Sequence, residues 1–365
     1  MSIDRLAIAL ALSTALAALP AAAQPAKPDN LSTLKQFKVA STDLNIPPVP
    51  QTGRHADAIK ENLKKVKLPP GFKIELYAVV PDARHMAVAP STNMLFVGTR
   101  KTTVWAVTDR NGDGIADEVK AFAPSLNFKV PNGVCWTKDG FLIVVEHNRV
   151  LNFPAAEFFY EGPDVAVIEV VSQGKLIPPD EESFNHGARV CRIGKDGMLY
   201  IALGQPFNVP PRDKLALFRE WGIGGIVRMN AFDGSKREVY ATGVRNSVGI
   251  EFNPKDNTLW FTDNQTDGMG DDIPAGEINR ATAAGQFFGH VGAGKRGEVV
   301  GEAAGRAEHG HRMAGLDAEL AGQRRARLTS ALPWQHGVPA CHVTSSPPGA
   351  GLWAGDLMSG KVSDG

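Results

Sequence analysis

The sequence predicts an all-β protein of the six-bladed β-propeller type, in an incomplete form with about four blades. A strand–turn–strand theme recurs along the chain, and the copies lie roughly 50 residues apart, the spacing of one four-stranded blade. The copies are "HMAVAPSTNMLFVGT" (85–99), "NGVCWTKDGFLIVVE" (132–146), "GARVCRIGKDGMLYIAL" (187–203) and "NSVGIEFNPKDNTLWFTD" (246–263). Each joins two apolar strands through a turn rich in Asp, Asn, Gly or Pro. A β-sandwich would lack this longer period.

The first 23 residues have the pattern of a secretory signal peptide. Arg5 precedes an apolar run from Leu6 to Leu19, and the small residues that follow predict cleavage near Ala23. A membrane anchor is the less favoured alternative, because the run is shorter than the roughly 20 residues that a span needs and Pro20 ends it. We therefore expect a periplasmic or secreted protein with no membrane span after cleavage.

Three further regions follow the signal peptide. Residues 24–70 are rich in Pro and Lys and predict an extended arm with one short helix near "ADAIKENLKKV". Residues 71–290 hold the blades. Residues 291–365 form an atypical tail that is rich in Ala, Gly and Arg, and it is expected to be irregular or helical, with a helix around "GLDAELAGQRRARL". A reading-frame shift is our preferred origin for this composition, and a genuine flexible or helical tail is the alternative.

Composition excludes several classes of function. The chain has 365 residues, with 39 Lys and Arg against 39 Asp and Glu, so its formal net charge is zero. This balance argues against nucleic-acid binding and against a polybasic membrane surface. Among the three cysteines, Cys135 and Cys191 lie inside strand patterns. We expect them to be buried thiols rather than a disulfide, although an exported protein would permit one.

A polar residue stands at the start of each repeat. His85, Asn132 and His186 precede the first strand of three copies, and Arg245 with Asn246 opens the fourth. In a propeller these positions converge at one end of the central channel. They are therefore candidates for binding a polar ligand on the axis. The alternative is that they satisfy the carbonyl groups of turns around the channel.

Two acidic loops are candidate calcium sites. "DRNGDGIADE" has the ligand spacing of a calcium loop, formed by Asp109, Asn111, Asp113 and Asp117. It is not an EF-hand, because Lys120 stands where the bidentate Glu is needed, and a plain hairpin turn is an equal alternative. "TDNQTDGMGDDIPAGEIN" (262–279) crowds carboxylates on a glycine-rich loop, which suits Ca²⁺ or a solvated acidic loop equally.

Three motifs in order, "NHGARVCRIGKDGMLYIALG", "GVRNSVGIEF" and "LWFTDNQTDGMGDDIPAGEIN", resemble the pyrroloquinoline quinone (PQQ)-dependent sugar dehydrogenases of the soluble glucose dehydrogenase and sorbosone dehydrogenase group. The resemblance covers roughly residues 70–290. It implies a six-bladed propeller with PQQ on its axial face and a calcium ion that polarises the quinone. It also implies a sugar or sugar-derived aldehyde as substrate and a cytochrome or quinone as external electron acceptor.

The resemblance also assigns roles to residues. His186 matches the general base, Arg245 the cation that stabilises charge on the quinone, and Asn246 its neighbour on the cofactor. Gln205 stands where the glucose enzymes carry an Asp that orients the His, which favours a sorbosone-type or divergent activity. The calcium side matches the backbone carbonyls around Gln265 and Thr266 and the loop of Asp271 and Asp272.

The tail departs from this family. Nothing in residues 291–365 matches the basic residues that the family's last blades place on the carboxylates of PQQ. As written, the chain is expected to lack two blades and to be inactive or nearly so. Two other functions compete with the PQQ enzyme. One is a calcium-dependent propeller hydrolase of the lactonase type, and the other is a non-catalytic propeller that binds a carbohydrate or a protein.

Overall fold

The computed structural model describes residues 37–41, 45–160, 164–268, 276–290, 340–345 and 351–352. By its internal contacts the chain divides into two units, residues 1–36 and 37–365, and every described residue belongs to the second unit. The expected signal peptide over residues 1–23 therefore lies outside the described residues. None of the helices within the described ranges is long and apolar enough to cross a membrane.

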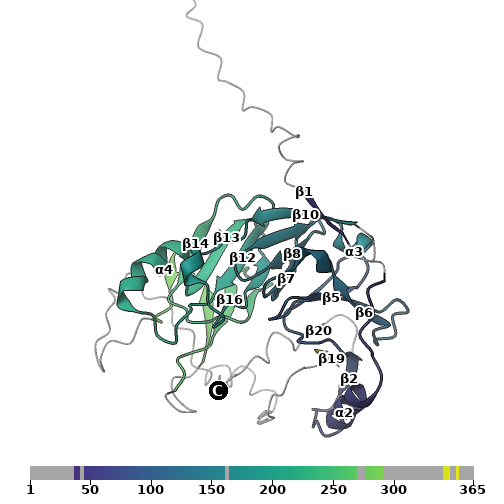
Figure 1. The fold of residues 1–365 in the computed structure, drawn as a ribbon. Helices are drawn as coiled ribbons and strands as arrows, with labels where there is room; N and C mark the ends of the chain where they lie inside the picture. Colours follow the sequence, from purple (N-terminus) through teal and green to yellow (C-terminus); the bar gives the residue numbers. More distant parts are fainter. Residues whose placement is uncertain are drawn as a thin grey trace, which may run out of the picture. The chain divides into compact units, whose positions relative to one another are not determined.

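Four sheets form the blades of an open β-propeller (Figure 1), as the repeat spacing predicts. Within each blade the strands follow one another in chain order and pair antiparallel. Blade 1 contains β3 (Met86–Val88), β4 (Leu95–Val97), β5 (Val104–Thr108) and β6 (Glu118–Phe122). Blade 2 contains β7 (Gly133–Trp136), β8 (Leu142–Val145), β9 (Val150–Phe153) and β10 (Asp164–Val171). Blade 3 contains β11 (Val190–Ile193), β12 (Met198–Leu203), β13 (Gly225–Asn230) and β14 (Glu238–Thr242), and blade 4 contains β15 (Ile250–Phe252), β16 (Leu259–Asp263) and β17 (Glu277–Ala281).

The repeated turn of the sequence closes the first hairpin of every blade. Each of these turns has one residue with a positive φ, namely Asn93 (56°), Gly140 (79°), Gly197 (77°) and Asn257 (59°). Asn and Gly adopt this left-handed conformation at little cost, which explains why one of these two residue types occupies the position in every turn. The recurring "TN", "DG" and "DN" pairs therefore fix the strand pairing in all four blades.

Two strands outside the repeats extend the sheets. β1 (Phe37–Ser41), from the expected arm, pairs antiparallel with β10 at the outer edge of blade 2. β18 (Gln286–Phe287) follows blade 4 in the chain but returns to blade 3, where it pairs parallel with β14. Both additions cover an outer strand that would otherwise present unpaired backbone groups. The arm predicted at 24–70 is thus partly built into the sheet.

A smaller sheet joins the start of the propeller to the tail. β2 (Phe72–Ala78) pairs antiparallel with β19 (Ala340–Ser345), which pairs with β20 (Gly351–Leu352). These two strands are the described part of the tail from 291 onward, and they differ from the irregular or helical structure expected there. The expected helix around "GLDAELAGQRRARL" lies outside the described residues.

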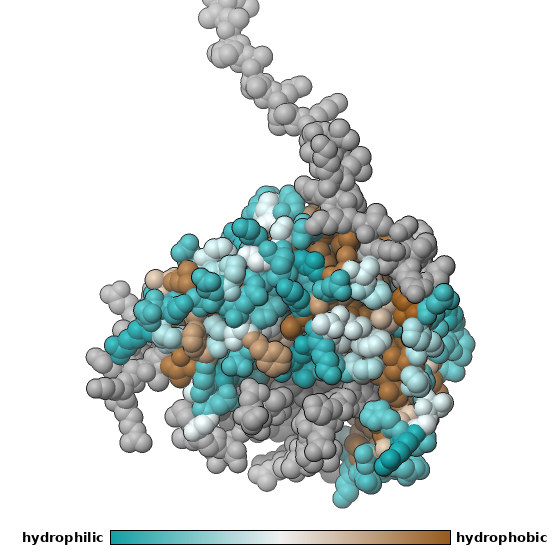
Figure 2. All heavy atoms as spheres, in the orientation of Figure 1, coloured by the Kyte–Doolittle hydropathy of each residue, from teal (hydrophilic) through white to brown (hydrophobic). Residues whose placement is uncertain are grey.

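The helices are few and short. The helix predicted in the arm is confirmed as α2 (Arg54–Leu63), which buries Ala56 and Ile59 against β2. The others are α3 (Ala156–Phe159), α4 (Leu215–Trp221) and the 3₁₀ turns Pro124–Leu126, Pro179–Glu181 and Arg212–Lys214. In Figure 2 hydrophilic residues cover most of the described surface that faces the viewer, with hydrophobic patches between them.

The apolar core lies between the blades. Phe96 and Phe122 of blade 1 pack edge-to-face at 5.1 Å, and Phe122 meets Phe153 of blade 2 at 5.0 Å between ring centroids. A second cluster joins blades 2 and 3, and a third joins blades 3 and 4, where Phe261 lies 4.8 Å from Phe288. Each blade is therefore stabilised by the faces of its neighbours rather than by a core of its own.

A disulfide corrects one expectation from the sequence. Cys135 on β7 and Cys191 on β11 form a buried disulfide, with their Cα atoms 6.0 Å apart. The two positions looked like separate strand residues, but they occupy matching places on the first strands of blades 2 and 3. Those strands lie side by side in the propeller, so the pairing follows from blade packing and not from chain order.

We predict that removing this disulfide weakens the protein substantially. Cys135 and Cys191 are 56 residues apart, so the chain-entropy model gives a loss of about 4 kcal/mol in the free energy of unfolding. Urea unfolding of the Cys135→Ser/Cys191→Ser variant tests this, and Cys341→Ser is the control that keeps the bridge. An unchanged free energy of unfolding in the double variant would contradict the bridge.

Candidate functional site

The first strands of the blades lie next to one another around the channel. β7 packs beside β3 and β11, and β11 packs beside β15. The predicted polar residues precede these strands, but at two different offsets. His186 and Asn246 stand four positions before the first residues of β11 and β15, whereas His85 and Asn132 stand directly before β3 and β7.

His85 and Asn132 serve the structure. Both are buried, and His85 Nδ1 accepts a hydrogen bond from Val134 N–H at 3.1 Å. Asn132 Nδ2 donates to the carbonyl of Arg189 at 2.6 Å. The alternative that these residues satisfy backbone groups around the channel therefore holds for this pair.

His186 has a fixed orientation. Its backbone is left-handed, with φ 53°, and its Nδ1 lies 2.6 Å from the carbonyl oxygen of Gln205. A carbonyl only accepts hydrogen bonds, so Nδ1 carries the proton in this pair. The other ring nitrogen, Nε2, then holds the lone pair. Gln205 thus orients His186 through its backbone and not through the side-chain amide that the sequence suggested.

Gly204 brings the candidate residues together. A Cβ atom at this position would lie 2.7 Å from both His186 Cβ and Asn246 Oδ1, closer than real side chains approach. The next residue, Gln205, donates its backbone N–H to the carbonyl of Arg245 at 3.0 Å. The end of β12 therefore joins the loop before β11 to the loop before β15, and His186, Gln205, Arg245 and Asn246 form one cluster.

Asp263 explains why Arg and Asn can stand at the entrance of a strand. Its buried carboxylate accepts the backbone N–H groups of Arg245 at 3.0 Å and Asn246 at 2.9 Å. Burial raises the pKa of Asp263 to about 7, and the two backbone hydrogen bonds oppose that rise. Asp263 belongs to the acidic loop 262–279 that the sequence offers as a candidate calcium site, but its carboxylate holds the backbone of Arg245 and Asn246 instead.

The guanidinium of Arg245 is buried, with only 3% of the side chain exposed. Its Nε donates to the carbonyl of Asn208 at 3.2 Å, and its Nη2 to Asn208 Oδ1 at 2.9 Å. Nη1 donates to the carbonyl of Asn264 at 3.0 Å, and Nη2 also forms an ion pair with Asp267. The sequence did not reveal Asn208, and it offered Asp267 only as one of the carboxylates of the candidate calcium loop 262–279, because both roles depend on how two loops meet.

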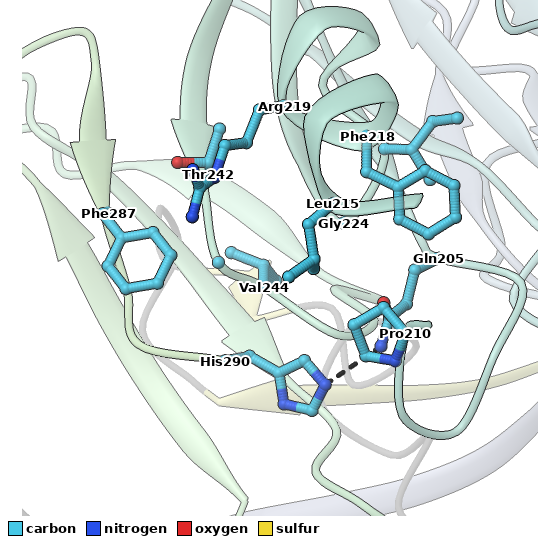
Figure 3. A pocket seen from close by; sticks show the side chains of 12 residues that line it. Gln205, Pro210, Leu215, Phe218, Arg219, Gly224, Thr242, Val244, Phe287 and His290 are labelled. Carbon is cyan, nitrogen blue, oxygen red and sulfur yellow. Dashed lines mark hydrogen bonds between the residues drawn. The ribbon is translucent and has the colours of Figure 1, made fainter. Parts of the chain in front are cut away.

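His290 is a second histidine of the site that the sequence did not single out. Figure 3 shows it turned toward Gln205, whose Nε2 lies 3.0 Å from His290 Nε2. His290 Nδ1 lies 3.4 Å from Gln265 Oε1. Burial, followed by the charges of Arg245 and His186, lowers the pKa of His290 to about 4. His290 is therefore neutral at pH 7, accepting from Gln205 and donating to Gln265.

A small pocket opens beside this pair (Figure 3). Its wall is mainly apolar and comes from α4, from the loop that precedes it and from the ends of blade 3. The lining residues are Gln205, Pro210, Leu215, Phe218, Arg219, Ile223, Gly224, Thr242, Gly243, Val244, Phe287 and His290. The pocket thus adjoins the polar cluster on the side of blade 3.

The first candidate calcium loop is organised as a hairpin turn between β5 and β6. Asp109 accepts the N–H groups of Gly112 at 2.9 Å and Gly114 at 3.0 Å. Side-chain oxygens of Asn111, Asp113 and Asp117 likewise accept backbone N–H groups of the same turn. This turn lies at the end of blade 1 opposite to the loops that carry the site.

The second candidate calcium loop is described only in part. Asp271 and Asp272 lie outside the described residues, while Gln265 donates its side-chain amide to Asp263 at 3.1 Å. Thr266 lies in the described part of the same loop. Within the described ranges, no group of three or more His, Cys, Asp or Glu side chains is arranged to hold a metal ion.

A long connection places His186. Residues 172–189, the β10–β11 connection, lie against the loop that follows β8. Asn148 of that loop accepts from Ile177 N–H at 2.8 Å and donates to its carbonyl at 3.1 Å. His147 Nε2 accepts from Ser183 N–H at 3.3 Å. These bonds hold the connection three residues before His186.

One family and one curated relative match this sequence. The family described as "Domain of unknown function (DUF7133)" matches residues 58–284. A protein of Borreliella burgdorferi that carries the name "Uncharacterized protein" is 27% identical over 238 residues, which is 64% of this chain and 58% of the relative.

A solved structure shares the fold. The PQQ domain of pyranose dehydrogenase from Coprinopsis cinerea superposes with a TM-score of 0.50 at 15% identity, over 61% of this chain and 57% of that domain. A Trichoderma reesei enzyme of carbohydrate-active family AA12 gives 0.48 at 17% identity, over 68% and 61%. The chain therefore spans about three-fifths of the length of these proteins.

We predict that His147 makes stability depend on pH. Burial, followed by the charge of Arg189, lowers the pKa of His147 to about 4, below the usual 6.5. The unfolded chain then binds a proton that the native protein does not, so stability is lost as pH falls from about 6.5 to about 4. Because the ring is partly exposed, we expect about 1 to 2 kcal/mol.

Urea unfolding of the wild type and His147→Gln at pH 7 and pH 4.5 checks this. The glutamine has no titrating group, so the variant should lose less stability on acidification than the wild type. His290 contributes equally to both proteins, so the difference between them isolates His147. Parallel losses in the two proteins would contradict the assignment.

Proposed function

The chain belongs to the family described as "Domain of unknown function (DUF7133)", and from its site we propose that it is a PQQ-dependent oxidoreductase of a sugar or sugar-derived aldehyde. One observation carries the proposal. An imidazole with a fixed tautomer and an amide meet at Gly204, and the next residue, Gln205, is bonded through its backbone to Arg245, whose guanidinium is buried in the adjoining loop. Solved propellers that include a PQQ domain share the fold, which supports the architecture.

Two side chains of this cluster, those of Arg245 and Asn246, suit the oxygens of PQQ. Arg245 and Asn246 would hold the cofactor, since a guanidinium and an amide donate to quinone and carboxylate oxygens. When bound, PQQ supplies the two-electron chemistry, and the protein supplies orientation and electrostatics. Gly204 matters here because any larger residue would force His186 and Asn246 apart.

His186 is the proposed general base. Its Nδ1 proton is held by the carbonyl of Gln205, so Nε2 is the atom that takes a proton from a substrate hydroxyl. The histidine cannot easily change tautomer, because turning the proton to Nε2 would set a lone pair against the carbonyl oxygen. The bond to Gln205 therefore replaces the carboxylate that glucose enzymes use at this point.

Arg245 is the proposed stabiliser of negative charge. Four of its five N–H groups donate to Asn208, to the Asn264 carbonyl and to Asp267. The fifth, on Nη1, has no partner among the described residues and can donate to a ligand oxygen. A donor held this way needs no reorganisation when charge develops.

The described residues do not support a calcium ion at the site. The oxygens of Asp263 and Asp267 are engaged by Arg245 and its neighbours, and the loop with Asp271 and Asp272 is not described. We derive no step through calcium.

Export is part of the proposal. Residues 1–23 have the pattern of a signal peptide, and the Cys135–Cys191 disulfide suits an oxidising compartment such as the periplasm. We predict that a bacterial host releases a chain beginning near Gln24, which mass spectrometry of the periplasmic fraction can establish. A full-length chain retained in the cytoplasm would contradict export.

We predict that, in a version of the protein that carries the two blades expected to be missing, His186→Ala abolishes sugar-dependent dye reduction while leaving PQQ binding within a few-fold of the parent. The base acts on the substrate, whereas Arg245 and Asn246 hold the cofactor. Binding is measured by equilibrium dialysis with PQQ, and oxidation is measured with aldoses and aldehydes. Arg280→Ala, an exposed change at the opposite end of blade 4, is the control for each readout.

Two results would overturn the proposal. If the parent that carries the two added blades does not bind PQQ, the site is not a quinone site. If His186→Ala keeps activity within a few-fold of the wild type, His186 is not the base. Hydrolysis of lactones without PQQ would instead select the hydrolase.

A further inference from the structure

An exposed aromatic ring stands beside His186. Phe184 lies two residues earlier in the β10–β11 connection, and 67% of its side chain is exposed. The two residues share a turn, in which Gly187 N–H donates to the carbonyl of Phe184 at 3.4 Å. Two residues span at most about 7 Å, so the Cα atoms of Phe184 and His186 lie within the length of one small molecule. A ring left in water next to a proposed base is typical of a binding surface.

Blade 1 supplies a cation to this ring. The guanidinium carbon of Arg100, in the loop between β4 and β5, lies 4.7 Å from the centroid of Phe184. Blade 2 separates that loop from β11 in the sheet order, so this contact extends the β10–β11 connection across the mouth of blade 2 to blade 1. Arg100 and Phe184 thus form one surface at the end of the propeller that carries His186.

More positive charge surrounds Arg100 than the nearby acids balance. Burial lowers the pKa of Arg84, in the loop before β3, and the charge of Arg100 adds to that lowering. Asp82 raises the pKa of Arg84 and so opposes burial and Arg100, since its Oδ1 lies 3.8 Å from Arg84 Nη2. Its Oδ2 accepts the backbone N–H of Arg100 at 2.8 Å. Exposed Lys101 and Lys129 flank them, and their segments meet where Val130 N–H donates to the Lys101 carbonyl at 2.8 Å.

The other acids of these loops are engaged elsewhere. Glu146 is paired with Arg149 and accepts Lys129 N–H, and Glu182 accepts from Asn148. Among the described residues, the four cations Arg84, Arg100, Lys101 and Lys129 therefore stand against two carboxylates, Asp82 and Glu182, and the bond of Glu182 to the neutral amide of Asn148 leaves its charge in place. Like charges held together are costly unless an anion joins them.

We propose that Arg84, Arg100 and Phe184 form a subsite for a carboxylate-bearing sugar, such as a hexuronate. The guanidinium groups match a carboxylate with paired N–H donors, and the apolar face of a sugar ring packs on the phenyl ring. The carboxylate would bind at blade 1, and the opposite end of the ring would face His186. This names a substrate class for the site, and it rests on the proposed function only for the role of His186.

The experiment measures sugar binding without cofactor. Titration calorimetry on the purified chain compares D-glucuronate, D-glucose and D-glucose 6-phosphate in low salt. We expect glucuronate to bind about tenfold or more tightly than glucose, the scale of one charge-assisted interaction. The preference should shrink in 0.5 M salt, because the cations are partly exposed.

Variants assign the preference to residues. Arg84→Gln/Arg100→Gln should bind glucuronate and glucose equally, and Phe184→Ala should weaken both sugars. Arg280→Gln removes one positive charge at the opposite end of blade 4 and should keep the wild-type preference. Thermal unfolding of every variant checks that it folds.

Three outcomes would overturn the subsite. They are equal binding of glucuronate and glucose by the wild type, an unchanged preference in Arg84→Gln/Arg100→Gln, and tighter binding of glucose 6-phosphate than of glucuronate. The proposed function fails separately. A chain that prefers glucuronate through Arg84 and Arg100 but does not bind PQQ would retain the subsite and lose the quinone enzyme.

Discussion

A propeller blade is apolar on both faces, and this constraint decides most of what the structure contains. Phe122 illustrates it, since its ring contacts Phe96 of its own blade and Phe153 of the next. A two-faced sheet cannot bury itself, so each blade needs a neighbour on either side. The same packing sets the first strands side by side around the axis, and it brings Cys135 and Cys191 to bonding distance.

The packing of the blades also positions the loops that form the candidate site. Loops from blades 3 and 4 meet because their first strands are adjacent, and Gly204 lets them approach to contact. Asp263 then holds Arg245 and Asn246 by their backbone, so the guanidinium is placed before any ligand arrives. A single buried carboxylate thus converts two polar residues at a strand entrance into an organised cluster.

The sequence predicts the features that repeat. Turn residues such as Asn93 and Gly197, together with the strand patterns, were enough for the blade count and the turns, and the stretch "ADAIKENLKKV" was enough for the short helix of the arm. The convergence of His186, Arg245 and Asn246 also followed from the repeat. These patterns involve residues that are close in the sequence, and the same pattern recurs in each blade.

Features that depend on contacts between distant segments could not be predicted. The disulfide requires two strands to be neighbours across a blade boundary, which no spacing reveals. β18 returns to blade 3 although it follows blade 4, and His290 reaches Gln205 only because of that return. The side chain of Gln205 was expected to face His186, but a backbone carbonyl already fills that role.

The hairpin turn at 109–118 has a consequence for how the molecule tolerates change. Its carboxylates accept the backbone N–H groups of the turn itself, and the turn lies at the end of the blades opposite to His186. The conformation of this turn therefore does not depend on the loops that carry His186 and Arg245. An attached reporter or surface anchor at this turn would therefore leave the cluster around Gly204 in place.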